Sequence, residues 1–334
     1  MRGKTSYLPK LKTFAATFLT VAITLSLSAL APGAPATASP DAEAQQRSRQ
    51  ALISWTTGTE LDAHPSEPKP PFDNNLRLLG GAWYGQLCTP CHGPHGDGNG
   101  PRANQLSPRP RDFTKGVYEF RSTATAALPT DEDLWKVVSN GIHGTAMVPW
   151  ITFSEYDRWA LVAYVETFSP RFAHDARPPA LEMTTPPPET PQLFAQGRRL
   201  YGDAGCVECH GVAGLGDGPS SPTLADATGL PIRPTDFSTG IFRRGSRRQD
   251  IFLTVRTGLD GTPMPSYADS LSTEQTWAIA AFIRSLIAGS QVSGNAEPSA
   301  TAAAARLQER AGMMIDMPAM GRLPICRDIH PPRR

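Results

Sequence analysis

Two pairs of cysteines, each followed at once by a histidine, are the residues best placed to do chemistry in this sequence. The first group is Cys88, Cys91 and His92, and the second is Cys206, Cys209 and His210. Two thiols at Cys-x-x-Cys spacing can form thioether bonds with the two vinyl groups of one porphyrin. The histidine that follows is then held where a ring nitrogen can ligate iron. The spacing therefore predicts two covalently attached haem c groups, with His92 and His210 as iron ligands.

Other uses of paired cysteines fit this sequence less well. A structural zinc site would need the pairs closer together, because Cys91 and Cys206 are 115 positions apart. A thioredoxin-like redox pair needs a neighbouring βαβ pattern, and no such pattern is present in the sequence. A disulfide within either pair suits an oxidising compartment, but it would leave both histidines unexplained.

Each histidine is followed by a methionine in a Gly-Thr-x-Met segment, which predicts the sixth iron ligand. Met147 lies 55 residues after His92, and Met264 lies 54 residues after His210. An axial methionine sulfur raises the reduction potential and closes the iron to small molecules. The alternative for both Met147 and Met264 is that the side chain only packs in the core. For the first haem, His143 is the rival candidate for the sixth ligand.

Several further residues have open roles. Arg109 and Arg233 each begin an Arg-Pro-x-Asp-Phe segment, and they either anchor haem propionates or only fix a loop. Cys326 has no partner once four cysteines bind haem, so we expect a free or intermolecular thiol. All histidines outside the two motifs are expected to be solvated loop residues, His143 included if it is not the ligand: His64, His95, His143, His174 and His330.

The haem motifs lie in two copies of one unit. Gly80-x-x-x-Tyr84 precedes the first motif, and the same pattern from Gly197 to Tyr201 precedes the second at an offset of 117. The Gly-Thr-x-Met segments repeat at the same offset, and each copy ends near a tryptophan, Trp159 or Trp277. We therefore predict two cytochrome c domains at 76–172 and 193–288, joined by a Pro-rich linker at 173–192.

Helix signals frame the motifs in both copies. Thr130–Asp133, Ser154–Asp157 and Ser272–Gln275 have the pattern of a capping box, in which a hydroxyl accepts a hydrogen bond from a backbone N–H of the first turn. The last helix of each copy is apolar nearly all round, so we expect it to be buried. No alternating run indicates a strand, and the predicted fold class is all-α with long loops around the haems.

The two ends of the chain have different compositions from the repeat. Basic residues followed by the uncharged run Phe14–Leu30 and by Ala36-Thr37-Ala38 predict a signal peptide at 1–38 and a periplasmic protein. An uncleaved membrane anchor is the alternative, and membrane contact is expected only in that case. Residues 39–75 are a lead segment, and residues 289–334 form an extension that we expect to be poorly ordered.

Composition excludes several classes of protein. With Lys+Arg 32 against Asp+Glu 31, the chain lacks the basic excess of a nucleic-acid binder. Five cysteines in 334 residues are too few for a disulfide-dense scaffold. The 33 prolines and 29 glycines predict many turns and long loops.

On these motifs the chain resembles the di-haem class I c-type cytochromes, which carry two cytochrome c domains in tandem. The resemblance implies a small all-α fold for each domain, with the first and last helices crossing and with histidine and methionine on opposite faces of the iron. It implies an electron carrier rather than an enzyme, and redox partner proteins such as a periplasmic or membrane oxidoreductase or a terminal oxidase of a respiratory chain. The alternatives are a di-haem peroxidase or a thiosulfate-oxidising cytochrome, which need one open iron, and a membrane-anchored subunit.

Overall fold

The computed structural model describes residue 46 and residues 62–287, all within the second of two compact units, Met1–Ser39 and Pro40–Arg334. The predicted signal peptide and the predicted C-terminal extension, with Cys326 and His330, lie outside the described residues. The lead segment is described at residue 46 and from residue 62 onward.

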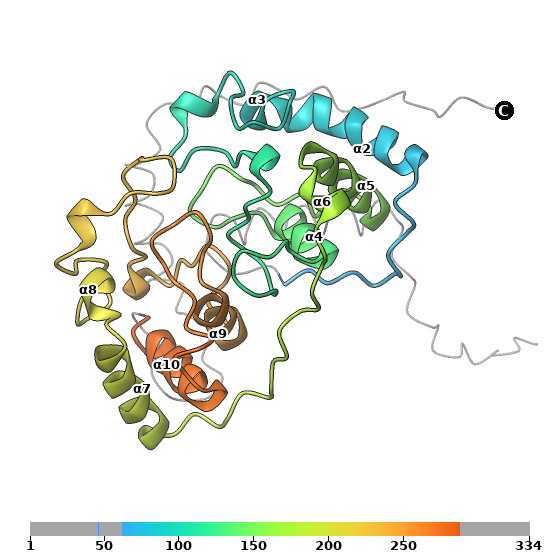
Figure 1. The fold of residues 1–334 in the computed structure, drawn as a ribbon. Coiled ribbons are helices and arrows are strands. Elements are labelled where there is room, and N and C mark those ends of the chain that lie inside the picture. The colour runs from blue at the N-terminus through green and yellow to red at the C-terminus, as the bar shows by residue number, and fades with distance from the viewer. Residues whose placement is uncertain (1–45, 47–61, 288–334) are drawn as a thin grey trace, which may run out of the picture. The chain divides into compact units, whose positions relative to one another are not determined.

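The first copy is a series of short helices joined by long loops (Figure 1). Its elements are α2 (Asn74–Leu87), α3 (Thr89–His92), η1 (Ala103–Gln105), η2 (Phe113–Lys115), α4 (Asp131–Asn140), α5 (Glu155–Val165), η3 (Glu166–Phe168) and α6 (Arg171–His174). The first helix begins two residues before the predicted start of the domain at 76.

The second copy repeats the first six of these elements in order, and its described residues contain no counterpart of η3 or α6. It contains α7 (Pro191–Asp203), α8 (Val207–His210), η4 (Ser221–Thr223), η5 (Phe237–Thr239), α9 (Arg248–Thr257) and α10 (Thr273–Ser285). Within residues 62–287 there is no β-strand, and the one isolated β-bridge pairs Ala225 with Pro231. The prediction of an all-α fold is confirmed. No helix in this described range is long and apolar enough to cross a membrane.

The first and last helices of each copy cross at a glycine. Helix α2 packs on α5, and α7 packs on α10, as Figure 1 shows. A Cβ atom on Gly80 would lie 1.9 Å from the carbonyl oxygen of Ala160, and one on Gly197 would lie 2.0 Å from that of Ala278. The glycine of each Gly-x-x-x-Tyr pattern therefore lets two helix backbones touch.

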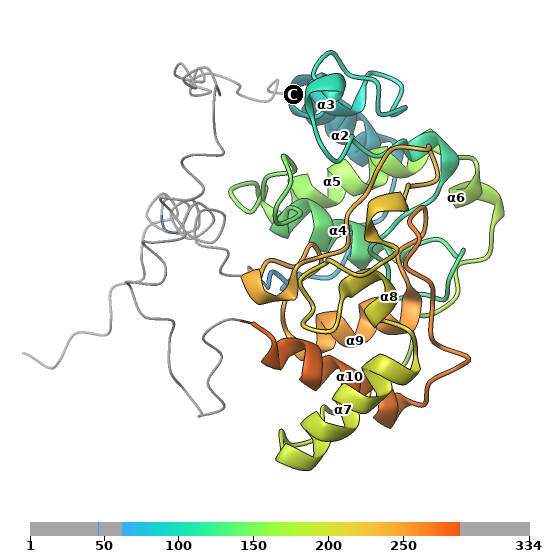
Figure 2. The ribbon, with the colours of Figure 1, turned by 90° about the vertical axis from the view of Figure 1, so that its left-hand side faces the viewer.

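The last helix of each copy is the centre of its core. Every residue from Thr276 to Ile283 in α10 is buried, and so is every residue from Arg158 to Ala163 in α5. Trp159 and Trp277 are both almost fully enclosed. Figure 2 shows α9 lying beside α10, and in the core Phe252 stacks on Trp277 with ring centroids 4.1 Å apart. Burial of these helices confirms the expectation from their apolar composition.

The predicted helix starts are supported by the capping bonds. Thr130 begins α4 with a complete capping box, and Ser272 begins α10 in the same way. At α5 the Ser154 hydroxyl accepts from Asp157 N–H, but the Asp157 carboxylate binds the Ser154 hydroxyl at 2.5 Å instead of its backbone N–H. Two of the three predicted capping boxes therefore form both of their hydrogen bonds, and the one at Ser154 forms only the bond to its hydroxyl oxygen.

The Pro-rich linker contacts both copies between α6 and α7. Leu181 N–H donates to Ser122 O in the first copy at 2.7 Å. In the second copy the Trp277 indole N–H donates to Thr184 Oγ1 at 2.9 Å, and Arg248 donates to Pro187 O at 2.6 Å. The linker is therefore held against the folded copies by hydrogen bonds along its length.

Candidate haem sites

The cysteine pairs and their histidines lie on two short helices, α3 and α8. In each helix the histidine N–H donates to the carbonyl of the first cysteine, at 2.8 Å from His92 to Cys88 and at 2.9 Å from His210 to Cys206. A single helical turn therefore holds each Cys-x-x-Cys-His group together. No disulfide joins any of these four cysteines. Burial raises the pKa of Cys88 to about 12 and that of Cys206 to about 11.

Each histidine ring is oriented by a backbone carbonyl. Nδ1 of His92 lies 3.2 Å from Arg111 O, and Nδ1 of His210 lies 3.3 Å from Thr235 O. A carbonyl oxygen only accepts, so Nδ1 carries the proton and Nε2 keeps a lone pair. Burial also lowers the pKa of both histidines, which favours the neutral ring. This is the state in which a histidine ligates a metal, with its second nitrogen held by an outer partner.

An aromatic ring packs against each of these imidazoles. The Phe113 ring stacks on His92 with centroids 4.6 Å apart, and Phe237 stacks on His210 at the same distance. Both phenylalanines end an Arg-Pro-x-Asp-Phe segment, whose middle residue supplies the carbonyl that faces the histidine. The segment therefore fixes the ring plane of the predicted ligand.

The Gly-x-x-x-Tyr pattern supports the chain just after each histidine. The Tyr84 hydroxyl donates to Gly93 O, and the Tyr201 hydroxyl donates to Gly211 O, both at 2.9 Å. Both glycines have a positive φ, 77° and 76°, which side chains with a Cβ rarely adopt. The tyrosines thus link the first helix of each copy to the end of its haem-binding helix.

Met147 lies in a loop that is closed by its own hydrogen bonds. Ile142 N–H donates to Met147 O at 2.9 Å, and Met147 N–H donates to Thr145 Oγ1 at 3.1 Å. Thr145 Oγ1 in turn donates to Ile142 O at 2.7 Å. The threonine of Gly-Thr-x-Met therefore stabilises the loop that presents the methionine.

The loop of Met264 has the same bonds at the corresponding positions. Leu259 N–H donates to Met264 O at 3.1 Å, Met264 N–H donates to Thr262 Oγ1 at 3.2 Å, and Thr262 Oγ1 donates to Leu259 O at 2.8 Å. Gly261 adopts φ 84°, and Gly144 adopts φ 73° at the equivalent place. Both methionines are therefore held by one type of loop.

A cavity in the second copy brings the four predicted haem residues together. Cys206, Cys209, His210 and Met264 all line it, and it holds about 1180 Å³ of space between atoms, with the solvent at its mouth included. Apolar side chains form much of its wall: Leu224, Ile232, Phe242, Ile251, Val255 and Ile283. Two thiols, a neutral imidazole and a thioether facing one apolar cavity are the donor set that a haem c group requires. The residues present therefore fit the cofactor.

The rival ligand His143 occupies the loop position of Asp260 in the other copy, four residues before the methionine. Asp260 points away from the cavity of the second copy, toward Thr125 and Ala126. His143 is only 6% exposed, so the expectation that it is solvated is wrong, and Met147 is partly buried. His64, His95 and His174 are exposed as expected, although His174 ends helix α6 rather than lying in a loop.

Arginines of the second copy make its cavity basic. Arg233, Arg243 and Arg244 line it, and burial lowers the pKa of Arg244 to about 10. Arg109 differs from its counterpart Arg233, because it lies on the surface and donates to Asn104 Oδ1 at 2.8 Å. Its contacts favour the loop role among the two that the sequence left open.

Sequence reasoning missed Phe120, Arg243 and Arg244 as cavity residues. Phe120 belongs to the first copy, yet it lines the cavity of the second. One signal was present in the sequence: Arg243-Arg244 stands where the first copy has Glu119-Phe120, when the copies are aligned on Phe113 and Phe237. Such a charge difference between repeated units indicates that the two sites differ in electrostatics.

The described residues offer no rival metal site. Among residues 62–287, no group of three or more His, Cys, Asp or Glu side chains could hold a metal ion.

Comparison with known proteins agrees with this arrangement. The cytochrome c family pattern matches residues 194–286, and the pattern of cytochrome c oxidase, cbb3-type, subunit III matches residues 78–165. Among solved structures, a chain of the reducing HAO-like protein complex of Kuenenia stuttgartiensis is 38% identical, with a TM-score of 0.61. That alignment covers 63% of this chain and 96% of the other. Among curated proteins, none matches this sequence.

Proposed function

Because the chain belongs to the di-haem class I c-type cytochromes, with two cytochrome c domains in tandem, we propose that it carries single electrons between redox partners through two haems ligated by histidine and methionine. The two domains imply two covalently bound haem c groups. When bound, each haem supplies an iron that gains and loses one electron.

The observation that carries this proposal is the matched support of all four axial residues. His92 and His210 each direct Nδ1 to a backbone carbonyl, and Met147 and Met264 each lie in a loop closed by a threonine hydroxyl. Side chains held in this way move little when the iron gains or loses an electron, and this favours fast electron transfer without substrate binding.

Met147 is the better candidate than His143 for the first haem. The loops of Met147 and Met264 share their hydrogen bonds, so corresponding side chains leave the loop in corresponding directions. Asp260, the counterpart of His143, is directed away from the second cavity, whereas Met264 lines it. This correspondence supports Met147 as the ligand and His143 as a packing residue.

We further propose that the protein works outside the cytoplasm as an electron-transfer subunit or partner of an oxidoreductase. Residues 1–38 have the sequence pattern of a signal peptide. The relative from K. stuttgartiensis is a chain of a protein complex, and the family matched by the first copy is an oxidase subunit. Export would leave a mature chain that begins at Ser39 and is recovered in the periplasmic fraction.

The test uses the purified di-haem protein in its oxidised form. We expect both haems to be low-spin, each with a methionine–iron charge-transfer band, and neither to bind cyanide or peroxide readily. Met264→Ala should convert only the second haem to high-spin, and Met147→Ala only the first, which halves the band in each case. Met183→Ala is the matched control, since Met183 is 42% exposed in the linker and should leave the spectrum unchanged.

Two results would contradict the proposal. An unchanged spectrum in either Met147→Ala or Met264→Ala would remove that residue as a ligand. A high-spin haem that binds peroxide in the unmodified protein would favour the enzyme alternative, because a di-haem peroxidase needs one open iron position.

A further inference from the structure

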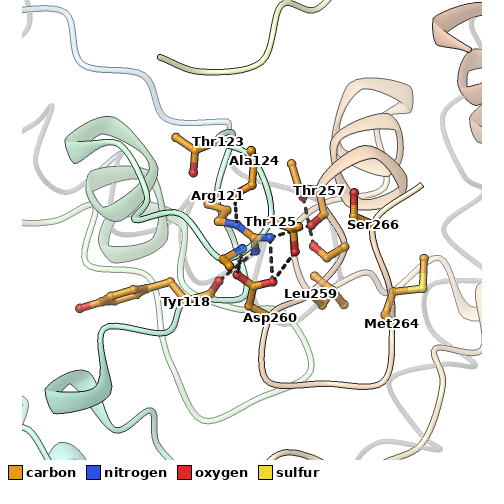
Figure 3. A network of polar contacts seen from close by, with 12 residues as sticks. Tyr118, Arg121, Thr123, Ala124, Thr125, Thr257, Leu259, Asp260, Met264 and Ser266 are labelled. Carbon is orange, nitrogen blue, oxygen red and sulfur yellow. Dashed lines mark hydrogen bonds and ion pairs between the residues drawn. The ribbon is translucent and has the colours of Figure 1, made fainter. Parts of the chain in front are cut away.

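Arg121 of the first copy is fully buried, and it reaches into the second copy (Figure 3). Its Nη2 donates to Thr257 O at 2.7 Å and to Asp260 Oδ1 at 2.8 Å. The rest of the guanidinium is bound within the first copy, through Nε to Ala124 O and Nη1 to Tyr118 O. This one side chain thus binds two positions in the second copy that are three residues apart.

Asp260 is bound by the first copy through both of its carboxylate oxygens. Besides Arg121, the Thr125 hydroxyl donates to Oδ1 at 2.9 Å and the Ala126 N–H donates to Oδ2 at 2.8 Å. Ala126 has a φ of 62°, in the left-handed region that residues other than glycine rarely adopt. The loop of the first copy therefore keeps an unfavourable backbone conformation at the residue that binds this carboxylate.

The residues that Arg121 and its neighbours bind are those that lead into Met264. Thr257 is the last residue of α9, and Asp260 lies within the loop that Leu259, Thr262 and Met264 close by hydrogen bonds. Figure 3 shows Met264 on the same loop, beyond Leu259 and Asp260. The contacts from the first copy therefore hold the loop at its start and at its middle.

We infer that Arg121 is a positioning residue for Met264, so that the first domain holds the methionine loop of the second. This inference rests on the proposed ligation by Met264. Arg121 is fully buried and the Asp260 side chain is 17% exposed, and each nitrogen of the guanidinium and each carboxylate oxygen makes at least one hydrogen bond. Loss of the Asp260 charge would leave the buried guanidinium without its ion-pair partner. Arg121 and Asp260 together thus restrict the loop to the conformation that directs the sulfur into the cavity.

The first copy has no equivalent pair at the corresponding positions. His143 replaces Asp260 in its loop, and Gly245 stands where Arg121 would be, when the copies are aligned on Phe113 and Phe237. The effect should therefore be confined to the second haem, and the first haem serves as an internal reference in each experiment.

The test measures amide hydrogen exchange and the optical spectrum of the di-haem protein. Arg121→Met removes the charge and the contacts to the second copy, and Asp260→Asn removes the charge but keeps an oxygen for Arg121. We expect exchange in residues 258–264 to accelerate about tenfold in both variants, as local opening becomes easier. We also expect loss of the half of the methionine–iron band that belongs to the second haem.

Arg109→Met is the control. Arg109 is an exposed arginine of the first copy that donates to Asn104 Oδ1 and Asn99 Oδ1, both in the first copy and away from Ala126 and Asp260 in the sequence. Exchange in residues 258–264 and the second haem's band should stay as in the unmodified protein. Haem content and far-ultraviolet circular dichroism identify any variant that has lost its fold, and Asp260→Asn is the milder change.

The outcomes separate this inference from the proposed function. If Met264→Ala alters the second haem while Arg121→Met and Asp260→Asn leave both the band and the exchange as in Arg109→Met, the positioning role is wrong and the ligation stands. If exchange accelerates but the band is intact, the positioning role is also wrong. If Met264→Ala itself changes nothing, the ligation is wrong.

Discussion

The hydroxyl of Tyr201 and the carbonyl of Gly211 illustrate how single residues support the predicted ligands. Tyr201 is buried on α7, and its hydroxyl donates at 2.9 Å to the residue that follows His210. The equivalent bond from Tyr84 to Gly93 supports His92. Each carbonyl also accepts a backbone N–H, from Gly96 at Gly93 and from Gly214 at Gly211, both at 3.2 Å, so the tyrosine supplies its second hydrogen bond just after a four-residue helix.

Tyr201→Phe should destabilise the second domain with little change of shape. The variant removes one of the two hydrogen bonds to the Gly211 carbonyl and leaves the one from Gly214 N–H, so the expected loss is about 0.5–1.5 kcal/mol. Urea unfolding of the di-haem protein, followed by far-ultraviolet circular dichroism, measures the loss. Tyr156→Phe is the control, because Tyr156 is 54% exposed, and its free energy of unfolding should not change. Equal stability of the two variants would show that the Tyr201 bond contributes nothing.

The crossing of α7 and α10 shows what an element requires of its sequence. Gly197 lies where the two helix backbones meet, and the carbonyl of Ala278 fills the place of a side chain. Two glycines in the same helix differ in this respect, because a Cβ on Gly202 would have no neighbour within 4 Å. One glycine of α7 is therefore required by packing, and the other is not.

Gly197→Ala should lower stability, and Gly202→Ala should raise it. The first forces the helices apart, which costs about 1–3 kcal/mol or more. The second gains about 0.5–1 kcal/mol, because alanine favours the helix over glycine. Thermal unfolding of the two di-haem variants measures whether the midpoint falls in the first and rises in the second. A stable Gly197→Ala protein with an unchanged midpoint would mean that the helices cross elsewhere.

At the scale of the whole molecule, the two haem sites differ in their surroundings although their predicted ligands are of the same types. Arg243 and Arg244 line the second cavity, and Arg244 donates to Arg121 O at 3.0 Å across the contact between the copies. Phe120 of the first copy lines the same cavity. Both copies therefore build the second site. Its wall carries Arg243 and Arg244, where the first copy has Glu119 and Phe120 in the aligned sequence.

Arg244→Gln should lower the reduction potential of the second haem and leave the first unchanged. A nearby positive charge favours the reduced state, which has one positive charge fewer. At an effective dielectric constant of about 20 the charge is worth on the order of 1 kcal/mol, or about 40 mV for a one-electron couple. Potentiometric titration measures the shift. Arg199→Gln is the control on the exposed surface of the second copy. A shift of equal size in both variants, or none in Arg244→Gln, would show that Arg244 does not set the potential.

The sequence by itself determined the cofactor, the duplication and the all-α class, and it predicted Cys88, Cys91, Cys206 and Cys209 as the covalent anchors. These features depend on short-range patterns: thiols and imidazole must be neighbours in the chain to bind one porphyrin, and Gly-x-x-x-Tyr and Gly-Thr-x-Met each place their groups within one or two turns. The axial roles of Met147 and Met264 stay predictions, which the matching loops support.

Only the tertiary structure decided what joins the two copies and what surrounds the second site. Arg121 and Asp260 are 139 positions apart, and Phe120 contributes to a cavity whose other walls begin at Tyr201. No periodicity or motif connects residues at such separations, because their contact depends on how two folded units pack and which buried charges remain to be paired. The structure also shows that each Arg-Pro-x-Asp-Phe segment holds the histidine with a backbone carbonyl and a phenylalanine ring. This role depends on how the loop folds, so the residue types alone do not reveal it.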